Sequence, residues 1–153
     1  MNEINNSSVY YTEVQKFRQP WLWALLLFSL CVVLYRGHGG IWVVVGVSVF
    51  LWFLQLETII SEQGISYRWL PFQRRPRLIK WEEMEKVTVR AYAPIAEFGG
   101  WGIRFSWRGT AQTVSGNNGI EIRKKSKRRF LLIGTQMPEQ VQQILMQNHL
   151  IVL

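Results

Sequence analysis

The densest group of side chains with a shared chemistry is a basic run over residues 123–129, in which six of seven residues are Lys or Arg. A second basic group lies earlier, at residues 74–77. Beside an anionic lipid surface each such cation contributes about 1 kcal/mol of attraction. The same runs are also typical of a solvated surface hairpin, and the sequence leaves both open. The residues expected to contact anionic phospholipid headgroups are Arg74, Arg75, Arg77, Lys124, Lys125, Lys127, Arg128 and Arg129.

Other residue types argue against a catalytic or metal site. All ten acidic residues are glutamates, so the aspartate used in many catalytic triads and cation sites is missing. The two histidines, His38 and His149, have no second potential ligand at metal-binding spacing, and Cys31 is the single cysteine. Glycine-rich phosphate loops are absent as well. We therefore expect a protein without enzymatic activity, cofactor or metal.

The positive charge also raises the question of nucleic acid. Residues 57–153 carry fifteen Lys and Arg against eight Glu, and aromatic residues stand beside several of these cations. Trp69, Phe105 and Trp107 nevertheless follow strand alternation, which favours core or interface positions over a stacking surface. No nucleic-acid partner is expected.

A glycine-dense segment, Gly99–Gly102, surrounds Trp101. Glycines this close together indicate positive φ angles or the close approach of another backbone. One interpretation is a tight loop held by a buried Trp101. The other is a protein-contact loop with Trp101 as its anchor, because tryptophan is frequent in interaction hot spots.

Two apolar runs, Trp21–Tyr35 and Ile41–Leu56, precede the basic region and contain no acidic residue. With their flanking residues they predict a transmembrane helical hairpin over 20–56, after an N-terminal cytoplasmic segment over 1–19. Positive charges lie outside both runs, at Lys16 and Arg18 and again after the second run. This distribution predicts that both termini face the cytoplasm.

Residues 57–153 show a different pattern, with apolar and polar residues alternating at a period of two. This predicts about seven short antiparallel strands that bend into a small barrel. Pro138 and Glu139 suit the first turn of a final helix, with Val141, Ile144 and Leu145 on one face. An all-β barrel covered by a C-terminal helix is the pleckstrin-homology-like plan.

Several segments of the sequence form a distinctive pattern: 79–84, 92–94, 99–104, 116–120 and 131–138. In these segments the chain resembles a group of bacterial membrane proteins with two transmembrane helices and a C-terminal pleckstrin-homology-like domain. The resemblance implies this fold and a place in the bacterial cytoplasmic (inner) membrane, without an assigned activity.

These observations predict a non-catalytic binding module, integral to the membrane, whose basic β-domain contacts the anionic lipid surface. The alternative is a protein-interaction or regulatory subunit that binds its partner through the Gly99–Gly102 loop or a strand edge, independently of lipid. Gly46 and Ser48 are small residues that permit close helix approach, so self-association is also open.

Overall fold

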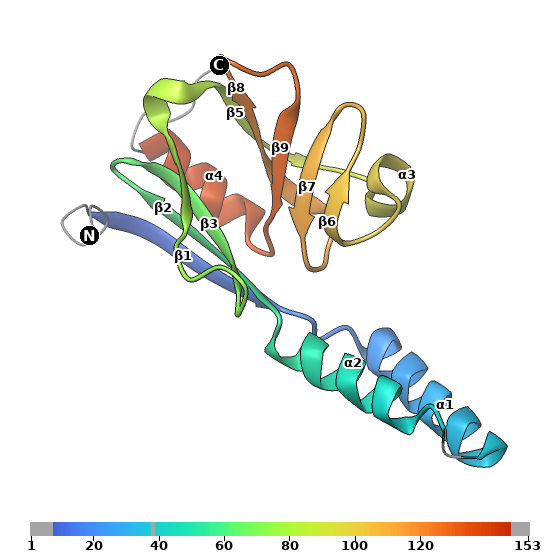
Figure 1. Cartoon of the computed structure of the whole chain (residues 1–153). Helices are drawn as coiled ribbons and strands as arrows, with labels where there is room; N and C mark the ends of the chain where they lie inside the picture. The colour runs from blue at the N-terminus through green and yellow to red at the C-terminus, as the bar shows by residue number, and fades with distance from the viewer. Residues whose placement is uncertain (1–7, 38, 148–153) are drawn as a thin grey trace.

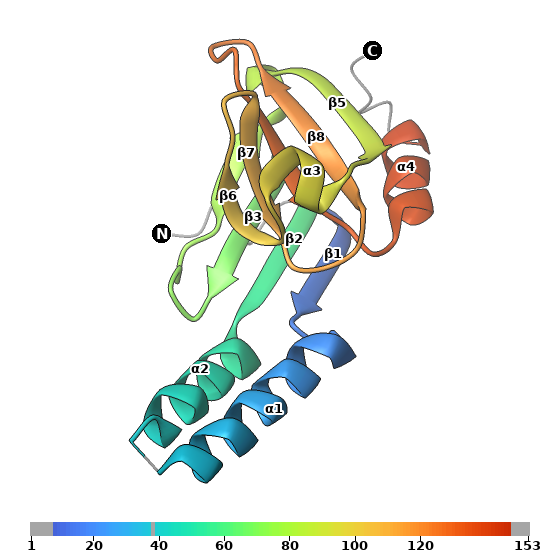
Figure 2. The same cartoon turned by 90° about the vertical axis from the view of Figure 1, so that its right-hand side faces the viewer.

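The computed structural model describes residues 8–37 and 39–147. In this part of the chain, two β-sheets form a body from which two helices extend as an arm (Figures 1 and 2). The arm consists of α1 (Pro20–Arg36) and α2 (Ile41–Phe53). The strands are β1 (Val9–Lys16), β2 (Gln55–Ser61), β3 (Gly64–Leu70), β4 (Arg77–Lys80), β5 (Met84–Ala91), β6 (Gly102–Phe105), β7 (Gly109–Thr113), β8 (Asn118–Lys124) and β9 (Phe130–Gly134). The other helical segments are the 3-10 turn η2 (Trp81–Glu83), α3 (Pro94–Phe98) and α4 (Pro138–Gln147).

The first sheet has the order β1-β2-β3-β4 and is antiparallel throughout. The second has the order β5-β8-β9-β7-β6, with β7 and β9 parallel. The predicted single all-β barrel of about seven strands, and with it the pleckstrin-homology-like plan, is therefore wrong. The alternation of side chains shows where strands lie, but it does not show which strands are neighbours.

Strand β1 comes before the arm and was not predicted as a strand. Its buried residues are Glu13 and Gln15, whereas Val14 is 47% exposed. In β1 the polar residues are buried and the apolar residue between them is exposed, the reverse of the usual alternation. For this reason the sequence did not indicate a strand here. Pairing of β1 with β2 places the two ends of the arm on neighbouring strands.

One main core lies between the two sheets and α4. Trp69 from the first sheet and Ile120, Ile122 and Ile133 from the second are at most 2% exposed. From α4, Leu145 is fully buried together with Val141, on the face that the sequence predicts, and α4 packs against β1, β5 and β8. The helix closes the core where the β1 and β5 edges of the two sheets approach each other.

The arm differs from the predicted transmembrane hairpin over 20–56. Among the described residues, none of the helices has the length and apolar character needed to cross a membrane. The 13-residue α2 ends at Phe53 because Leu54 is extended and Gln55 already belongs to β2. At about 1.5 Å per residue it rises roughly 20 Å, against a hydrocarbon core of about 30 Å. The transmembrane hairpin and the inner-membrane location with cytoplasmic termini are therefore wrong.

Candidate functional site

Most of the large apolar side chains that are exposed in the described chain lie on the arm. Neither α1 nor α2 contains a buried residue. Phe28, Trp42 and Trp52 are 67%, 83% and 67% exposed. A Cβ built on Gly46 would meet no atom within 4 Å, so this small residue does not lie at the contact between the helices. Apolar surface of this extent marks an interaction site rather than an ordinary protein surface.

A pocket of about 440 Å³ lies where β1 leads into the arm. Lys16 and Arg18 line it together with Trp23 and Trp52, whose rings meet edge-on at 5.6 Å. The indole nitrogen of Trp23 donates a hydrogen bond of 3.0 Å to the backbone oxygen of Phe17. The sequence indicated Lys16 and Arg18 only as orientation charges. Their place beside two indole rings depends on the return of the chain through α2.

The turn between β3 and β4 lies beside the same end of the arm (Figures 1 and 2). Phe72 in this turn packs against Phe50 of α2, with ring centroids 5.5 Å apart. Arg74 and Arg75 follow it and are exposed. We call Lys16, Arg18, Arg74 and Arg75 the arm-base cations. Two of the predicted lipid-contact residues are thus placed next to the apolar helices.

The turn between β8 and β9 lies at the opposite end of the body, away from the arm (Figures 1 and 2). It contains Lys125, Lys127, Arg128 and Arg129, and Lys124, the last residue of β8 just before it, pairs with Glu83 at 3.2 Å. The eight predicted cations therefore do not form one surface.

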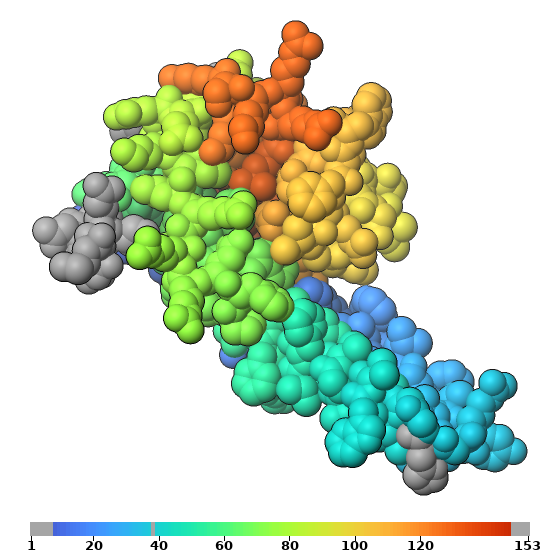
Figure 3. Space-filling model, viewed as in Figure 1, coloured from blue at the N-terminus to red at the C-terminus, as the bar shows by residue number. Residues whose placement is uncertain are grey.

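Arg77 joins the second basic group rather than its sequence neighbours. Together with Lys124, Lys127 and Arg129 it lines a cleft of about 830 Å³. We call it the basic cleft. Figure 3 shows this face, with the orange atoms of the β8–β9 turn above the green atoms of the β3–β4 segment and the gold atoms of β6. The cleft could not be found from the sequence, because its walls come from different sheets.

The Trp101 loop lies near the start of α1. Gly99, Gly100 and Gly102 have φ angles of 71°, 120° and 106°, as the glycine spacing predicts. Cβ atoms on Gly99 and Gly102 would meet nothing within 4 Å, so backbone conformation requires these glycines rather than close packing. The Trp101 indole donates to the Gly116 oxygen at 2.8 Å and packs on Trp21 with ring centroids 6.0 Å apart. Its role as a protein-contact anchor stays a prediction.

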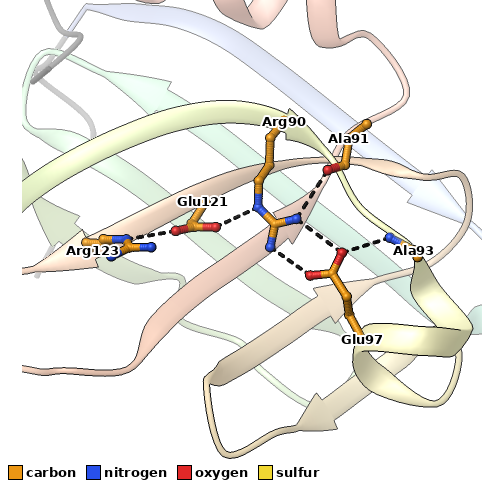
Figure 4. Close-up of polar contacts among 6 residues, drawn as sticks. All are labelled: Arg90, Ala91, Ala93, Glu97, Glu121 and Arg123. Atoms are coloured by element: carbon orange, nitrogen blue, oxygen red, sulfur yellow. Dashed lines mark hydrogen bonds and ion pairs between the residues drawn. The ribbon is translucent and has the colours of Figure 1, made fainter.

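An arginine-centred network holds the preceding helix α3 in place (Figure 4). Arg90 on β5 donates to both carboxylate oxygens of Glu97, at 3.2 and 2.9 Å, and to Glu121 on β8 at 2.6 Å. Arg123 donates to the second Glu121 oxygen at 2.8 Å. The hydrogen bond from Arg90 holds the pKa of Glu97 below its ordinary value. These contacts tie α3 to β5 and β8 of the second sheet.

A buried carboxylate in β1 forms the second network. Oε1 of Glu13 accepts from Gln15 at 2.9 Å and from the Gln136 backbone nitrogen at 2.7 Å. Oε2 accepts from Tyr11 at 2.9 Å and from Thr135 at 2.7 Å. Burial, followed by the neighbouring charge of Glu13, raises the pKa of Tyr11 above its ordinary range. These bonds tie the first sheet to the segment that leads into α4.

Two of the predicted strand aromatics are on the surface rather than in the core. Trp69 is 2% exposed, but Phe105 and Trp107 are 80% and 79% exposed. Phe105 lines the basic cleft, whereas Trp107 lies under the Arg108 guanidinium, 5.1 Å from the ring centroid. Within the described residues no three metal-ligating side chains come together. His38 and His149 lie outside the described residues.

Comparisons with family models, curated proteins and solved structures found no match. The expected membership in a two-helix membrane family is therefore wrong: no family model supports it, and the described helices do not reach the required length.

Proposed function

We propose that this protein is a non-catalytic binding module for an anionic lipid surface. In this proposal the arm enters the apolar layer of the lipid, and the arm-base cations contact the headgroups. The observation that carries the proposal is the complete absence of buried residues from α1 and α2, although both helices consist almost entirely of apolar residues.

The distribution of apolar residues around the helices favours lipid over a single protein partner. A helix that docks on a protein needs one apolar face and keeps its opposite face polar. Between Trp21 and Tyr35, and between Ile41 and Phe53, there is no charged residue on any side. Exposed apolar side chains occur along both helices, from Leu25 to Phe53. An apolar environment on several sides accommodates such a surface better than one flat protein contact does.

The charges at the base of the arm support the same orientation. Lys16 and Arg18 line the pocket with Trp23 and Trp52, and amphipathic indole rings favour the headgroup level of a bilayer. Arg74 and Arg75 follow Phe72, which contacts the arm directly. Electrostatic attraction decays within about one Debye length, so the β8–β9 turn at the far end contributes little in this orientation.

The native Cys31 provides a test of the arm. It is the single cysteine of the sequence and lies exposed on α1. The full chain, labelled there with an environment-sensitive fluorophore, is mixed with phosphatidylcholine vesicles with or without phosphatidylglycerol. We expect a blue shift and quenching by spin-labelled lipid. The matched control, Cys31→Ser with Ser126→Cys, places the label on the distal turn, where it should stay in water. An unchanged Cys31 signal with all vesicles would overturn the proposal.

Charge variants separate the two ends of the body. Arg74→Gln with Arg75→Gln should weaken binding to phosphatidylglycerol vesicles by about fivefold per charge, from about 1 kcal/mol each. Lys125→Gln with Arg128→Gln, which removes the same charge from the distal turn, should leave binding unchanged. If the two pairs of substitutions weakened vesicle binding equally, the proposed orientation, in which the arm and the arm-base cations face the lipid, would be contradicted.

A further inference from the structure

The basic cleft offers a second interaction surface, independent of lipid. Its lining residues include Arg77, Lys124, Lys127 and Arg129 and no acidic residue. Arg77, Lys127 and Arg129 are exposed and have room to turn toward a ligand, whereas Lys124 is shared with Glu83. Its volume of about 830 Å³ lies within the range of ligand-binding clefts, about 300–1,000 Å³. These four cations form the rim of the cleft, and their positive charge requires an anionic occupant.

Part of the cleft lining is apolar and comes from the second sheet. Ile103 and Phe105 alternate along β6 and are 49% and 80% exposed. Thr110 is the register partner of Phe105 on β7, and Leu131 is in turn the partner of Thr110 on β9. The occupant must therefore carry apolar groups as well as negative charge. A small free anion does not use this apolar part of the lining.

The edge of β4 forms the opposite wall. Arg77, Leu78 and Ile79 all line the cleft, although successive side chains of a strand point to opposite faces. Three consecutive lining residues indicate that the strand presents its edge. Among the described residues, β4 has one neighbour, β3, in the first sheet. The other edge therefore carries backbone groups available for pairing with an added strand.

We infer that the basic cleft binds an extended acidic segment of a partner protein, which adds to the first sheet as a strand along β4. In this arrangement the backbone of the segment pairs with the edge of residues 77–80. Its acidic side chains contact the cations of the rim, and its alternate apolar side chains lie on Ile103, Phe105 and Leu131. Backbone pairing supplies affinity, and the alternation of charged and apolar side chains supplies specificity.

The test uses a fluorescein-labelled peptide of alternating Glu and Val with the full chain in a non-ionic detergent. Fluorescence anisotropy should show salt-sensitive binding, and the corresponding Lys–Val peptide should not bind. A Glu–Val peptide with alternate amides methylated on the pairing edge should bind at least about tenfold more weakly, since it loses backbone donors. Binding of the methylated peptide at full strength would overturn strand addition.

Two pairs of substitutions separate the cleft from general positive charge. Arg77→Gln with Arg129→Gln should weaken peptide binding about fivefold, a magnitude expected for two exposed ion pairs. Lys125→Gln with Arg128→Gln removes the same charge from residues that do not line the cleft and should have little effect. All four side chains are exposed, so the variants should keep the fold. Equal losses in both pairs, or displacement of the peptide by millimolar inorganic phosphate, would overturn the inference.

Discussion

The body and the arm of this protein are both rich in apolar residues, but they place them in opposite environments. In the body, strands and α4 turn their apolar side chains inward, and many of these are fully buried. In the arm no residue is buried. The difference lies in the arrangement of residues rather than in their number. Strands with one polar face can cover a core, whereas helices without a polar face need an apolar environment outside the chain.

The largest effect should come from matched truncations in the two parts. Leu145→Ala removes a fully buried side chain from α4 and should lower the free energy of unfolding by about 2–5 kcal/mol. Leu27→Ala makes the same change at a position 64% exposed on α1 and should change it by less than about 0.5 kcal/mol. Equilibrium urea unfolding of the full chain in a non-ionic detergent measures both. A large loss for Leu27→Ala would show that the arm is packed within the protein.

A smaller effect should follow from loss of the Glu13 network. Glu13→Gln replaces a carboxylate oxygen that accepts hydrogen bonds by an amide that donates them, so buried donors lose their partner. We expect the free energy of unfolding to fall by about 1–3 kcal/mol in the same urea experiment. Thr12→Ala, at the exposed neighbouring position of β1, is the control and should be close to neutral. If both variants unfold at the wild-type midpoint, the network does not stabilise the junction between the first sheet and α4.

Much of the local structure could be predicted from the sequence. Alternation located the strands that contain Ile65 and Tyr67 and those that contain Ile120 and Ile122, all of which are buried. Pro138 and the spacing of Val141 and Leu145 located α4. Strand β1 could not be found this way, because Glu13 and Gln15 are its buried residues and their hydrogen-bond partners outside β1 are more than a hundred residues away.

The candidate sites were less predictable than the elements that form them. The basic residues were evident, but Arg77 lies with Lys127 and Arg129 in the cleft, whereas its neighbours Arg74 and Arg75 lie by the arm. The turn between β3 and β4 was indicated by the sequence, but the direction in which each arginine leaves it was not. The length of α2 was also overestimated, because the apolar run in the sequence continues through Leu54 and Leu56, beyond the end of the helix at Phe53. Leu56 is a buried core residue of β2 rather than a continuation of the helix.

The smallest effect concerns α3, which one ion-pair network attaches to the second sheet. Because the Arg90 hydrogen bond lowers the pKa of Glu97 from its ordinary 4.5, protonation of Glu97 is harder in the folded protein than in the unfolded one. The stability from this pair is therefore complete above the ordinary pKa and is lost as the pH falls through the lowered value. The amides of Gly99 and Gly100, which bond to Ile95 and Pro94, should lose protection from hydrogen exchange in that acidic range, after correction for the intrinsic exchange rate. In Glu97→Gln this loss should already be present at neutral pH. Unchanged protection in that variant would mean that the glycine turn holds α3 without the network, and the attachment of this helix would then depend on the packing of Phe98 against Tyr92 and Phe130.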